Sequence, residues 1–378
     1  MSGTRATFGL TQASRRWWVT LFVLFGASAY VYAGRNRIAP STAQFGGPAQ
    51  GTTYSVVLGN GGARTAAYMQ TLQSAVDSVI VDIDRKMSSY DPESELMRFN
   101  RNTSTAPVSV SPQLEEVIRQ SLVVSEASGG AFDVSVGPLV EAWGFGTGGT
   151  TGRIPPDTLL WALRARVGWK KLHLNTHTVS KVHPALEIDL SAIAPGYTVD
   201  LISELLTARG EPNHFVELGG EVRARGRNAR DEPFRVGIEE PIPEVRRVRS
   251  VVGLSNRSMA TSGNYRDFQD LNGVRYSHIL DPSTGVPVRH NLLSVTVLHE
   301  SCALADAWAT ALFVVGPDRA WDLAAANNLE VLLLTAGPNG EVQERMTNGF
   351  SSIVLTGDKL RPVDHSTRRS DAPKRGVP

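Results

Sequence analysis

The sequence has few cysteines, little net charge and only one long hydrophobic run. Cys302 is the single cysteine among 378 residues, which excludes an internal disulfide, a multi-cysteine zinc site and an iron–sulfur cluster. The 38 Lys and Arg residues are almost balanced by 37 Asp and Glu residues, and the basic residues do not cluster strongly. We therefore expect no nucleic-acid partner. A hydrophobic content of 41% excludes a disordered chain and is enough for a sizeable core.

The one hydrophobic run covers residues 17–33 and has arginines on both sides. Its length is close to that needed to span a thin bilayer, so we interpret residues 1–37 as a signal peptide or a signal anchor. Small residues up to Ala33 suit cleavage, whereas Trp17 and Trp18 suit a membrane interface. Both interpretations predict export to the periplasmic side of the cytoplasmic membrane, with the protein anchored if the segment is uncleaved.

The rest of the chain reads as one folded body between two polar segments. Residues 38–51 are rich in Pro, Gly, Ser and Gln and are expected to form a linker. Residues 361–378 are expected to form a disordered tail. The folded domain is therefore predicted over residues 52–360, and it contains no repeat of solenoid period.

Strand-like and helix-like segments occur in blocks and do not alternate strictly. This order favours an α+β fold with mainly antiparallel sheets and packed helices. Strands are predicted at 52–58, 185–190, 214–218, 234–238, 248–254, 274–280 and 293–298, and helices at 66–87, 113–128, 196–208 and 301–315.

Asp306 and Thr310 are four positions apart in the predicted helix 301–315 and share one face among alanines. A carboxylate, a hydroxyl and a main-chain carbonyl would hold Mg²⁺ if substrate phosphate completed the shell. The alternative is an ordinary hydrogen-bonded pair on a helix surface. Taken alone, the spacing favours this hydrogen-bonded pair, and the small neighbouring side chains shift the balance only slightly toward the metal site, because they allow another backbone to approach.

Two other segments carry candidate chemistry. His278 precedes an Asp-Pro turn at a predicted strand end and is either a general base or a structural histidine bonded to a carbonyl. The glycine-rich stretch 129–146 would let backbone amides approach a ligand, with Trp143 or Phe145 stacking on a flat ring, or it is a connection with core aromatics. No Walker loop occurs.

Seven segments in order resemble the FAD:protein FMN transferase (flavin transferase, ApbE-type) family. The match covers essentially the whole predicted domain. The segments are 51–54 (GTTY); 87–90 (MSSY) with Ser94 and Asn100; 130–146, containing GAFD, GPLV and WGFG; 188–197 (IDLSAIAPGY); 219–220 (GG); 261–265 (TSGNY); and 278–287 (HILDPSTGVP) followed by 305–307 (ADA) and Thr310.

The resemblance implies a bilobal, T-fold-related α+β structure whose cleft binds FAD, with Mg²⁺ at the diphosphate. The metal ligands would be the Ala192 carbonyl, Asp306 and Thr310, and His278 and Asp306 would be catalytic. FAD contacts would come from Met87, Ser88, Ser89, Tyr90, Asp133, the position of Pro195, Thr261, Ser262, Gly263, His278 and Leu280.

The family reaction implies transfer of FMN from FAD to a Thr or Ser hydroxyl of an exported electron-transport protein, a subunit of a membrane redox complex, with release of AMP. Chemistry at the diphosphate leaves the flavin ring untouched, which agrees with the absence of a second cysteine. The alternatives are a Mg²⁺-dependent FAD pyrophosphatase, in which water replaces the hydroxyl, and a non-catalytic FAD-binding protein.

The sequence departs from the family pattern at several positions. Pro195 replaces a residue whose side chain reaches FAD, and proline has neither a charged head nor a backbone donor. Gln50 stands where Met is common, and Glu217 and Glu221 stand beside the glycine pair where Asn and Asp are common. Because the metal and histidine positions are kept, we expect altered FAD binding rather than an inactive site.

Overall fold

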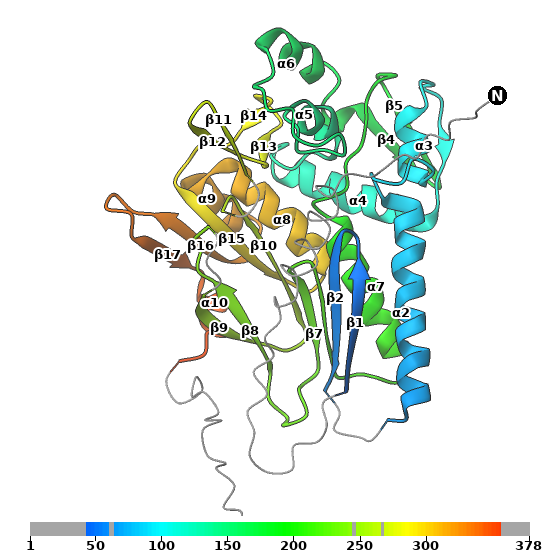
Figure 1. The fold of residues 1–378 in the computed structure, drawn as a ribbon, viewed down its shortest axis with the longest axis vertical. Helices are drawn as coiled ribbons and strands as arrows, with labels where there is room; N and C mark the ends of the chain where they lie inside the picture. The colour runs from blue at the N-terminus through cyan, green and yellow to red at the C-terminus, as the bar shows by residue number, and fades with distance from the viewer. Residues whose placement is uncertain (1–42, 60–63, 244–246, 266–267, 357–378) are drawn as a thin grey trace, which may run out of the picture.

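A computed structural model describes residues 43–59, 64–243, 247–265 and 268–356 (Figure 1). The predicted signal segment 1–37 and the predicted tail 361–378 lie outside these residues. Within the described part of the chain, no helix combines the length and the apolar character that crossing a bilayer requires.

An antiparallel sheet of eight strands forms the centre of the fold (Figure 1). Every neighbouring pair in it is antiparallel, and the α+β prediction is confirmed. The strand order is β1 (Ala43–Ala49), β2 (Thr52–Leu58), β6 (His214–Leu218), β7 (Glu221–Arg225), β10 (Arg257–Gly263), β15 (Leu292–His299), β16 (Glu330–Ala336) and β17 (Val342–Met346).

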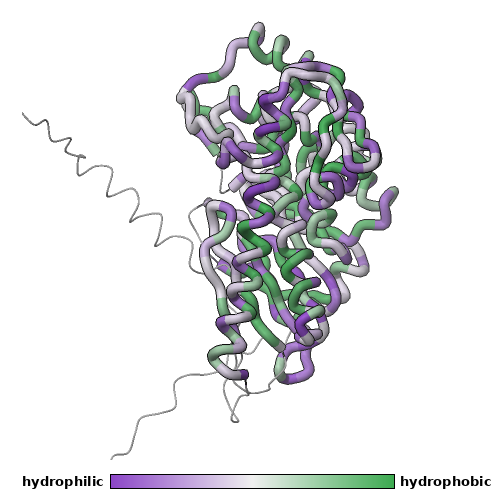
Figure 2. Tube along the Cα trace, turned by 90° about the vertical axis from the view of Figure 1, so that its right-hand side faces the viewer, coloured by the Kyte–Doolittle hydropathy of each residue, from purple (hydrophilic) through white to green (hydrophobic). Residues whose placement is uncertain are grey.

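The two faces of this sheet are covered differently. On one face, Val56 and Val216 pack with α2 (Ala66–Met87) and α7 (Ala194–Ala208). On the other face, Val57 and Phe215 pack against a separate hairpin, β8 (Phe234–Glu239) and β9 (Val248–Leu254). Because side chains alternate along a strand, consecutive residues serve opposite layers. Figure 2 shows the hydrophobic segments running through the interior of the molecule.

A second group of elements lies above the sheet in Figure 1 and includes a small three-stranded sheet in the order β3-β5-β4. The remaining elements of the fold are α3 (Glu95–Arg101), β3 (Val108–Ser109), α4 (Pro112–Ala127), η1 (Val134–Val136), α5 (Gly137–Ala142), α6 (Asp157–Arg164), η2 (Trp169–Lys171), β4 (Leu172–Asn175), β5 (Thr178–Lys181), β11 (Phe268–Leu271), β12 (Val274–Ser277), β13 (Leu280–Asp281), β14 (Val286–Pro287), α8 (Cys302–Val315), α9 (Pro317–Ala326) and α10 (Asn348–Ser351).

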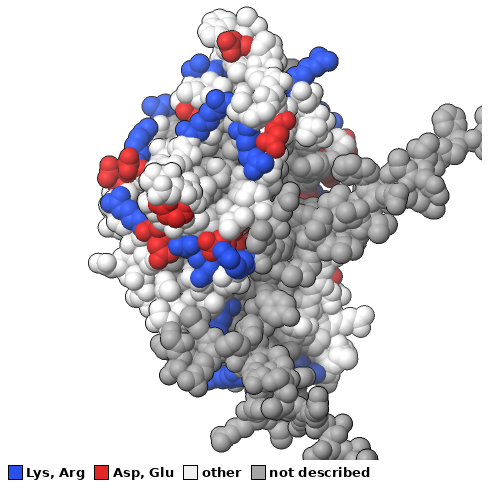
Figure 3. Space-filling view, turned by 60° about the vertical axis from the view of Figure 1, so that its left-hand side comes forward, with Lys and Arg blue, Asp and Glu red and all other residues white. Residues whose placement is uncertain are grey.

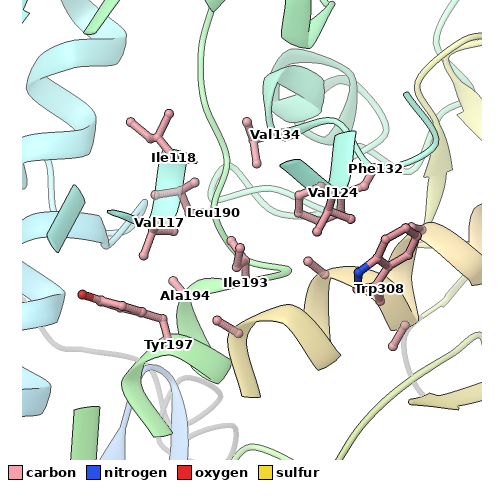
Figure 4. Close-up of a cluster of buried hydrophobic side chains, with 14 of the residues drawn as sticks. Val117, Ile118, Val124, Phe132, Val134, Leu190, Ile193, Ala194, Tyr197 and Trp308 are labelled. Carbon is pink, nitrogen blue, oxygen red and sulfur yellow. The ribbon is translucent and has the colours of Figure 1, made fainter. Parts of the chain in front are cut away.

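The core between the two groups joins α4, α7, α8 and the segment before α7 (Figure 4). Val117 and Ile118 of α4 lie near Leu190 and Ile193, and Trp308 of α8 closes the cluster. Leu190 and Ile193 are almost completely buried, so apolar packing fixes the short segment that contains Ala192.

Several element predictions are confirmed to the residue. The predictions for 52–58, 66–87, 214–218 and 248–254 coincide with β2, α2, β6 and β9. Ser111 caps α4 by accepting a hydrogen bond from the Leu114 N–H.

The predicted linker 38–51 is wrong over Ala43–Ala49, which form β1 and pair with β2 along seven residues. Glycine and proline conceal this strand in the sequence, because both are usually depleted in strands. Pro48 is tolerated since β1 is an edge strand, where one side needs no donor.

One strand prediction is wrong and another is wrong in part. Residues 185–190 form no strand, although their apolar pattern alternates, because side chains and isolated main-chain bonds hold them. The predicted strand 274–280 is interrupted between β12 and β13, where the Ile279 N–H donates to Ser277 Oγ at 3.1 Å.

The surface of the described residues mixes charges of both signs. On the face in Figure 3, Lys and Arg side chains are interspersed with Asp and Glu side chains. Two of the surface ion pairs are Arg275–Asp270 and Arg249–Glu344, both at 3.1 Å.

Candidate active site

A cleft of about 670 Å³ is bounded by the sheet, α8, the β8–β9 hairpin and the upper group of elements. Side chains that are far apart in the sequence meet along its wall. The predicted site residues that line it are Ser89, Tyr90, Asp133, Ala192, Thr261, Ser262, Gly263, His278, Leu280, Asp306 and Thr310.

Three predicted FAD contacts are not on the cleft wall. Met87 is 5% exposed and packs in the core with Ile83, because the apolar stripe of α2 continues to its last residue. Ser88 Oγ instead accepts the Tyr90 N–H at 3.2 Å and closes the turn after α2. Pro195 lies in the first turn of α7 and does not line the cleft.

Asp306 and Thr310 lie one helical turn apart on α8 and both face the cleft. The Asp306 carboxylate is 7% exposed, and the Gly196 N–H lies 3.4 Å from its Oδ2. Thr310 Oγ1 is 3.1 Å from Ser262 Oγ on β10. The predicted oxygen pair is therefore present on one helix face inside the cleft.

The closeness of α7 and α8 depends on a glycine. A Cβ atom at Gly196 would lie 2.5 Å from the Cys302 carbonyl oxygen and 2.8 Å from the Ala303 Cα. Asp200, one turn further along α7, accepts hydrogen bonds from Ser301 Oγ at 2.7 Å and from the Cys302 N–H at 2.9 Å. Close packing and helix capping thus fix the start of α8, the helix that carries Asp306.

A cluster of carboxylates occupies the floor of the cleft. Burial raises the pKa of Asp306 well above its ordinary value, and the neighbouring negative charge of Glu221 raises it further. Burial raises the pKa of Glu221 to about 7 and that of Glu217 also to about 7. Glu217 Oε1 accepts the Gly220 N–H at 3.1 Å.

In the sequence, Glu217 and Glu221 stand out only as departures from the family pattern. The antiparallel hairpin of β6 and β7 brings both into the cleft, with the glycine pair at its turn. Acidic residues flanking a glycine turn were a signal that could have identified them. Their approach to Asp306 was not predictable, because it depends on how the sheet packs against α8.

The described residues fit a divalent cation at Asp306. Among them, no group of three or more His, Cys, Asp or Glu side chains has the arrangement of a metal centre. The nearly buried Asp306 carboxylate nevertheless has only one long contact, with the Gly196 N–H, and Glu221 is its acidic neighbour. Within the described chain, no ion pair neutralises the carboxylate of Asp306 or that of Glu221. A hard cation with oxygen ligands would offset these charges. Thr310 and the Ala192 segment supply further oxygens on the same cleft wall.

His278 lies in the cleft between β12 and β13. Its ring is half-buried and meets Phe145 edge to face, with 6.4 Å between the ring centroids. Phe145 comes from the glycine-rich stretch, so this contact joins two segments that the sequence analysis treated separately.

Asp133 lines the cleft, but its side chain also organises the cleft wall. Oδ1 accepts from the Ser135 N–H at 2.8 Å and from Ser135 Oγ at 2.6 Å, and Oδ2 accepts from the Trp169 N–H at 2.9 Å. Burial raises the pKa of Asp133. These bonds hold η1 and η2 together, a structural role that the sequence did not indicate.

Asn100 and Lys181 hold the segment that leads to Ala192. Asn100 Nδ2 donates to the Ile188 carbonyl and Asn100 Oδ1 accepts the Ile188 N–H, both at 2.8 Å. The buried Lys181 Nζ donates to the Leu186 and Phe99 carbonyls at 2.9 Å and 3.2 Å. These side chains replace the strand pairing that the alternating pattern predicted.

Comparison with known proteins identifies the class of this fold and cleft. The sequence profile of the ApbE family matches residues 50–333, and the chain therefore belongs to the ApbE family of flavin transferases. It is 39% identical over 341 residues to a Vibrio cholerae protein named FAD:protein FMN transferase, covering 90% of this chain and 99% of the relative. A Haemophilus influenzae protein of the same name is 39% identical over 316 residues, covering 82% of this chain and 91% of the relative.

Solved structures agree with this assignment. The flavin transferase ApbE from Vibrio cholerae superposes with a TM-score of 0.76 at 38% identity, covering 83% of this chain and 99% of that structure. The apo form of the Pseudomonas stutzeri flavinyl transferase ApbE also has a TM-score of 0.76, at 33% identity, covering 84% and 98%.

Proposed function

We propose that this enzyme transfers FMN from FAD to a threonine or serine hydroxyl of an exported electron-transport protein, and that the reaction depends on Mg²⁺ and releases AMP. One observation carries the proposal. In a chain of the ApbE family, the buried carboxylate of Asp306 faces a cleft beside Thr310 and Glu221.

The reaction is a displacement at phosphorus. The acceptor oxygen forms a bond to the phosphorus on the flavin side of the diphosphate, and the bond from that phosphorus to the bridging oxygen breaks. FMN becomes linked to the acceptor by a phosphodiester, AMP leaves with the bridging oxygen, and the hydroxyl proton is released. Positioning and electrostatic stabilisation supply most of the acceleration in such transfers.

Asp306, Thr310 and the Ala192 carbonyl would hold the magnesium ion. When bound, the ion offsets the negative charge of the diphosphate. Asp306 is suited to this task because α8 fixes its position and burial leaves its charge poorly solvated. Asn100 supports the arrangement by holding Ile188, upstream of Ala192.

His278 is the proposed base for the acceptor hydroxyl. An unassisted hydroxyl is a weak nucleophile, and a positioned base contributes ~10² to 10⁴-fold. The imidazole lies on the cleft wall, where Phe145 restricts the orientation of its ring. FAD itself would lie along the wall formed by Tyr90, the Asp133 segment and Thr261 to Gly263.

The test uses the full chain, FAD, Mg²⁺ and purified exported electron-transport subunits of the source organism. Mass spectrometry of each subunit is expected to show the mass of one FMN on a threonine or serine, with one AMP released per transfer. Free FMN and AMP without any modified acceptor would instead support the pyrophosphatase. FAD that remains bound and intact with Mg²⁺ and acceptor would support a non-catalytic binding protein.

We also propose that the protein acts on the periplasmic side of the cytoplasmic membrane. The support is residues 1–37, whose apolar run and flanking arginines are typical of an export signal or anchor. Fractionation of cells producing a tagged full chain tests this: recovery of the folded protein only from the cytosol would contradict it.

A further inference from the structure

One strand of the hairpin over the cleft has an unpaired edge. β8 pairs with β9 and with no other strand of the described chain. Its burial alternates: Phe234, Val236 and Ile238 are buried, whereas Gly237 is exposed. The buried side chains fix the strand to the central sheet through the apolar cluster that contains Phe215 and Val222.

The bonds of β9 show which main-chain groups of β8 are unpaired. The Gly253 N–H donates to the Ile353 carbonyl at 2.9 Å, and the Val251 carbonyl accepts the Leu355 N–H at 2.8 Å, so both residues direct these groups away from β8. Main-chain groups alternate sides along a strand, and Val252 therefore faces its partner Val236.

By the same alternation, Arg235 and Gly237 direct their N–H and C=O groups away from β9. None of the main-chain bonds found among the described residues uses these groups on that side. An unpaired edge of this kind is a template for another extended chain.

The edge opens into the cleft that contains Asp306. Val236, Gly237 and Ile238 line this cleft together with Glu221 and Asp306. Gly237 has no side chain that would keep an approaching backbone away, and β8 contains no proline. Its charged residues are Arg235, which pairs with Glu232 at 3.4 Å, and Glu239. The six residues of β8 would span about 20 Å of an added strand.

We propose that the outer edge of β8 binds the acceptor protein by adding the segment around its target hydroxyl as a further β-strand. This inference rests on the proposed function and names how its protein substrate is recognised. The acceptor is the occupant we infer because the edge is continuous with the reaction cleft. Main-chain pairing would hold the segment in register, and the alternation of side chains would turn the hydroxyl toward the cleft.

The test compares Gly237→Pro with Gly237→Ala in the full chain. Proline removes the outward N–H of residue 237. The β8–β9 bonds remain, because they do not use this N–H. The backbone can accept proline here, since Gly237 is not among the residues with positive φ. Alanine keeps the N–H, and its Cβ would lie 3.1 Å from a Val248 methyl carbon, so it controls for the added bulk.

The readout is transfer to the electron-transport subunit that becomes flavinylated in the assay of the proposed function. For Gly237→Pro we expect the KM for this subunit to rise about tenfold, with unchanged FAD affinity, and for Gly237→Ala a change of less than about threefold. A folded Gly237→Pro variant with the wild-type KM overturns the docking inference alone. Absence of transfer by the wild-type protein overturns the proposed function and this inference with it.

Hydrogen exchange of the wild-type protein supplies a second test that needs no variant of this chain. The same subunit with its target threonine changed to valine is added, so that no transfer occurs. Slower exchange of the outward Arg235 and Gly237 amides supports the inference, and unchanged exchange of both overturns it. Protection of these two amides already present before the subunit is added means that this chain or a second copy covers the edge, which also overturns it.

Discussion

Helix α8 and strand β8 both line the cleft, but the α7–α8 junction that positions α8 and the β8–β9 hairpin are held in different ways. At the junction, Gly196 allows the helices to touch, and Asp200 accepts main-chain hydrogen bonds at the start of α8. The hairpin is attached to the sheet through the apolar cluster that includes Phe234 and Val252. Polar bonds and close contact thus fix the start of α8, whereas the hairpin is held by apolar packing together with the bonds of Arg249 to Glu344 and to the Val342 carbonyl.

Removing the Asp306 carboxylate should give the largest effect. Asp306→Ala is expected to lower the rate of FMN transfer by more than about 10³-fold, because charge stabilisation of several kcal/mol is lost. Circular dichroism should show a fold like that of the wild type. Asp322→Asn, at an exposed acid of α9 outside the cleft, is the matched control. Full activity of Asp306→Ala would remove the metal assignment.

The contact between β6 and α7 should also lose stability as the pH falls. The Nδ1–H of buried His214 donates to the Glu211 carbonyl at 2.7 Å, and its Nε2 accepts from Ser203 Oγ at 2.7 Å. Burial lowers the pKa of His214 from 6.5 to about 4. The unfolded chain therefore binds more protons between these values, and the free energy of unfolding should fall by about 3 kcal/mol from pH 7 to pH 4 through this residue.

Denaturant unfolding as a function of pH checks this contribution. His214→Gln should flatten the loss of stability between pH 6.5 and pH 4, while His173→Gln, at an exposed histidine, should keep the wild-type slope. Equal slopes in all three proteins would show that His214 does not set the acid sensitivity.

The contact between α7 and α8 is tested by Gly196→Ala. The new Cβ would meet the Cys302 carbonyl at 2.5 Å, so we expect a loss of about 2 kcal/mol in unfolding free energy and a lower transfer rate. For the unfolding free energy, Gly137→Ala is the matched control, because the nearest contact of its Cβ would be 3.4 Å in another first helical turn. If both variants were equally stable, close approach would not be the reason for glycine at 196.

The smallest effect is expected on the hairpin side. Val252 is completely buried in the cluster between hairpin and sheet, and Val252→Ala should lower the unfolding free energy by about 1.5 kcal/mol through lost apolar burial. Because the Val252 side chain contributes only apolar burial, this loss should not change between pH 7 and pH 5. Thermal denaturation at both pH values provides the measurement, and a strongly pH-dependent loss would contradict the comparison.

Local sequence patterns were sufficient to predict elements whose main-chain hydrogen bonds form within the element or with one nearby partner. The boundaries of α2 follow from its apolar spacing, and α8 from its Ser301 cap, whose Oγ accepts the Leu304 N–H. The predicted strand 185–190 was wrong because Asn100 and Lys181, which are distant in the sequence, take the main-chain bonds that a neighbouring strand would have taken.

The candidate site, too, was predictable only where a local sequence pattern fixes the position of a side chain. Asp306 and Thr310 share a helix face by spacing alone, and both line the cleft. Met87 was expected at the flavin because it begins a family motif, but the apolar stripe of α2 turns its side chain into the core. The motif identified the segment, while the helix decided where this side chain points.

The sequence by itself determined the family, the α+β class, most helices and strands, and the one-turn spacing of the two oxygen groups on α8. Each of these depends on residue order or on periods of two and 3.6 residues. Only the tertiary structure decided that Glu221 lies beside Asp306, that β1 closes one edge of the sheet, and that the outer edge of β8 faces the cleft. These features arise from contacts between distant segments, whose free energies depend on packing and burial that no local pattern encodes.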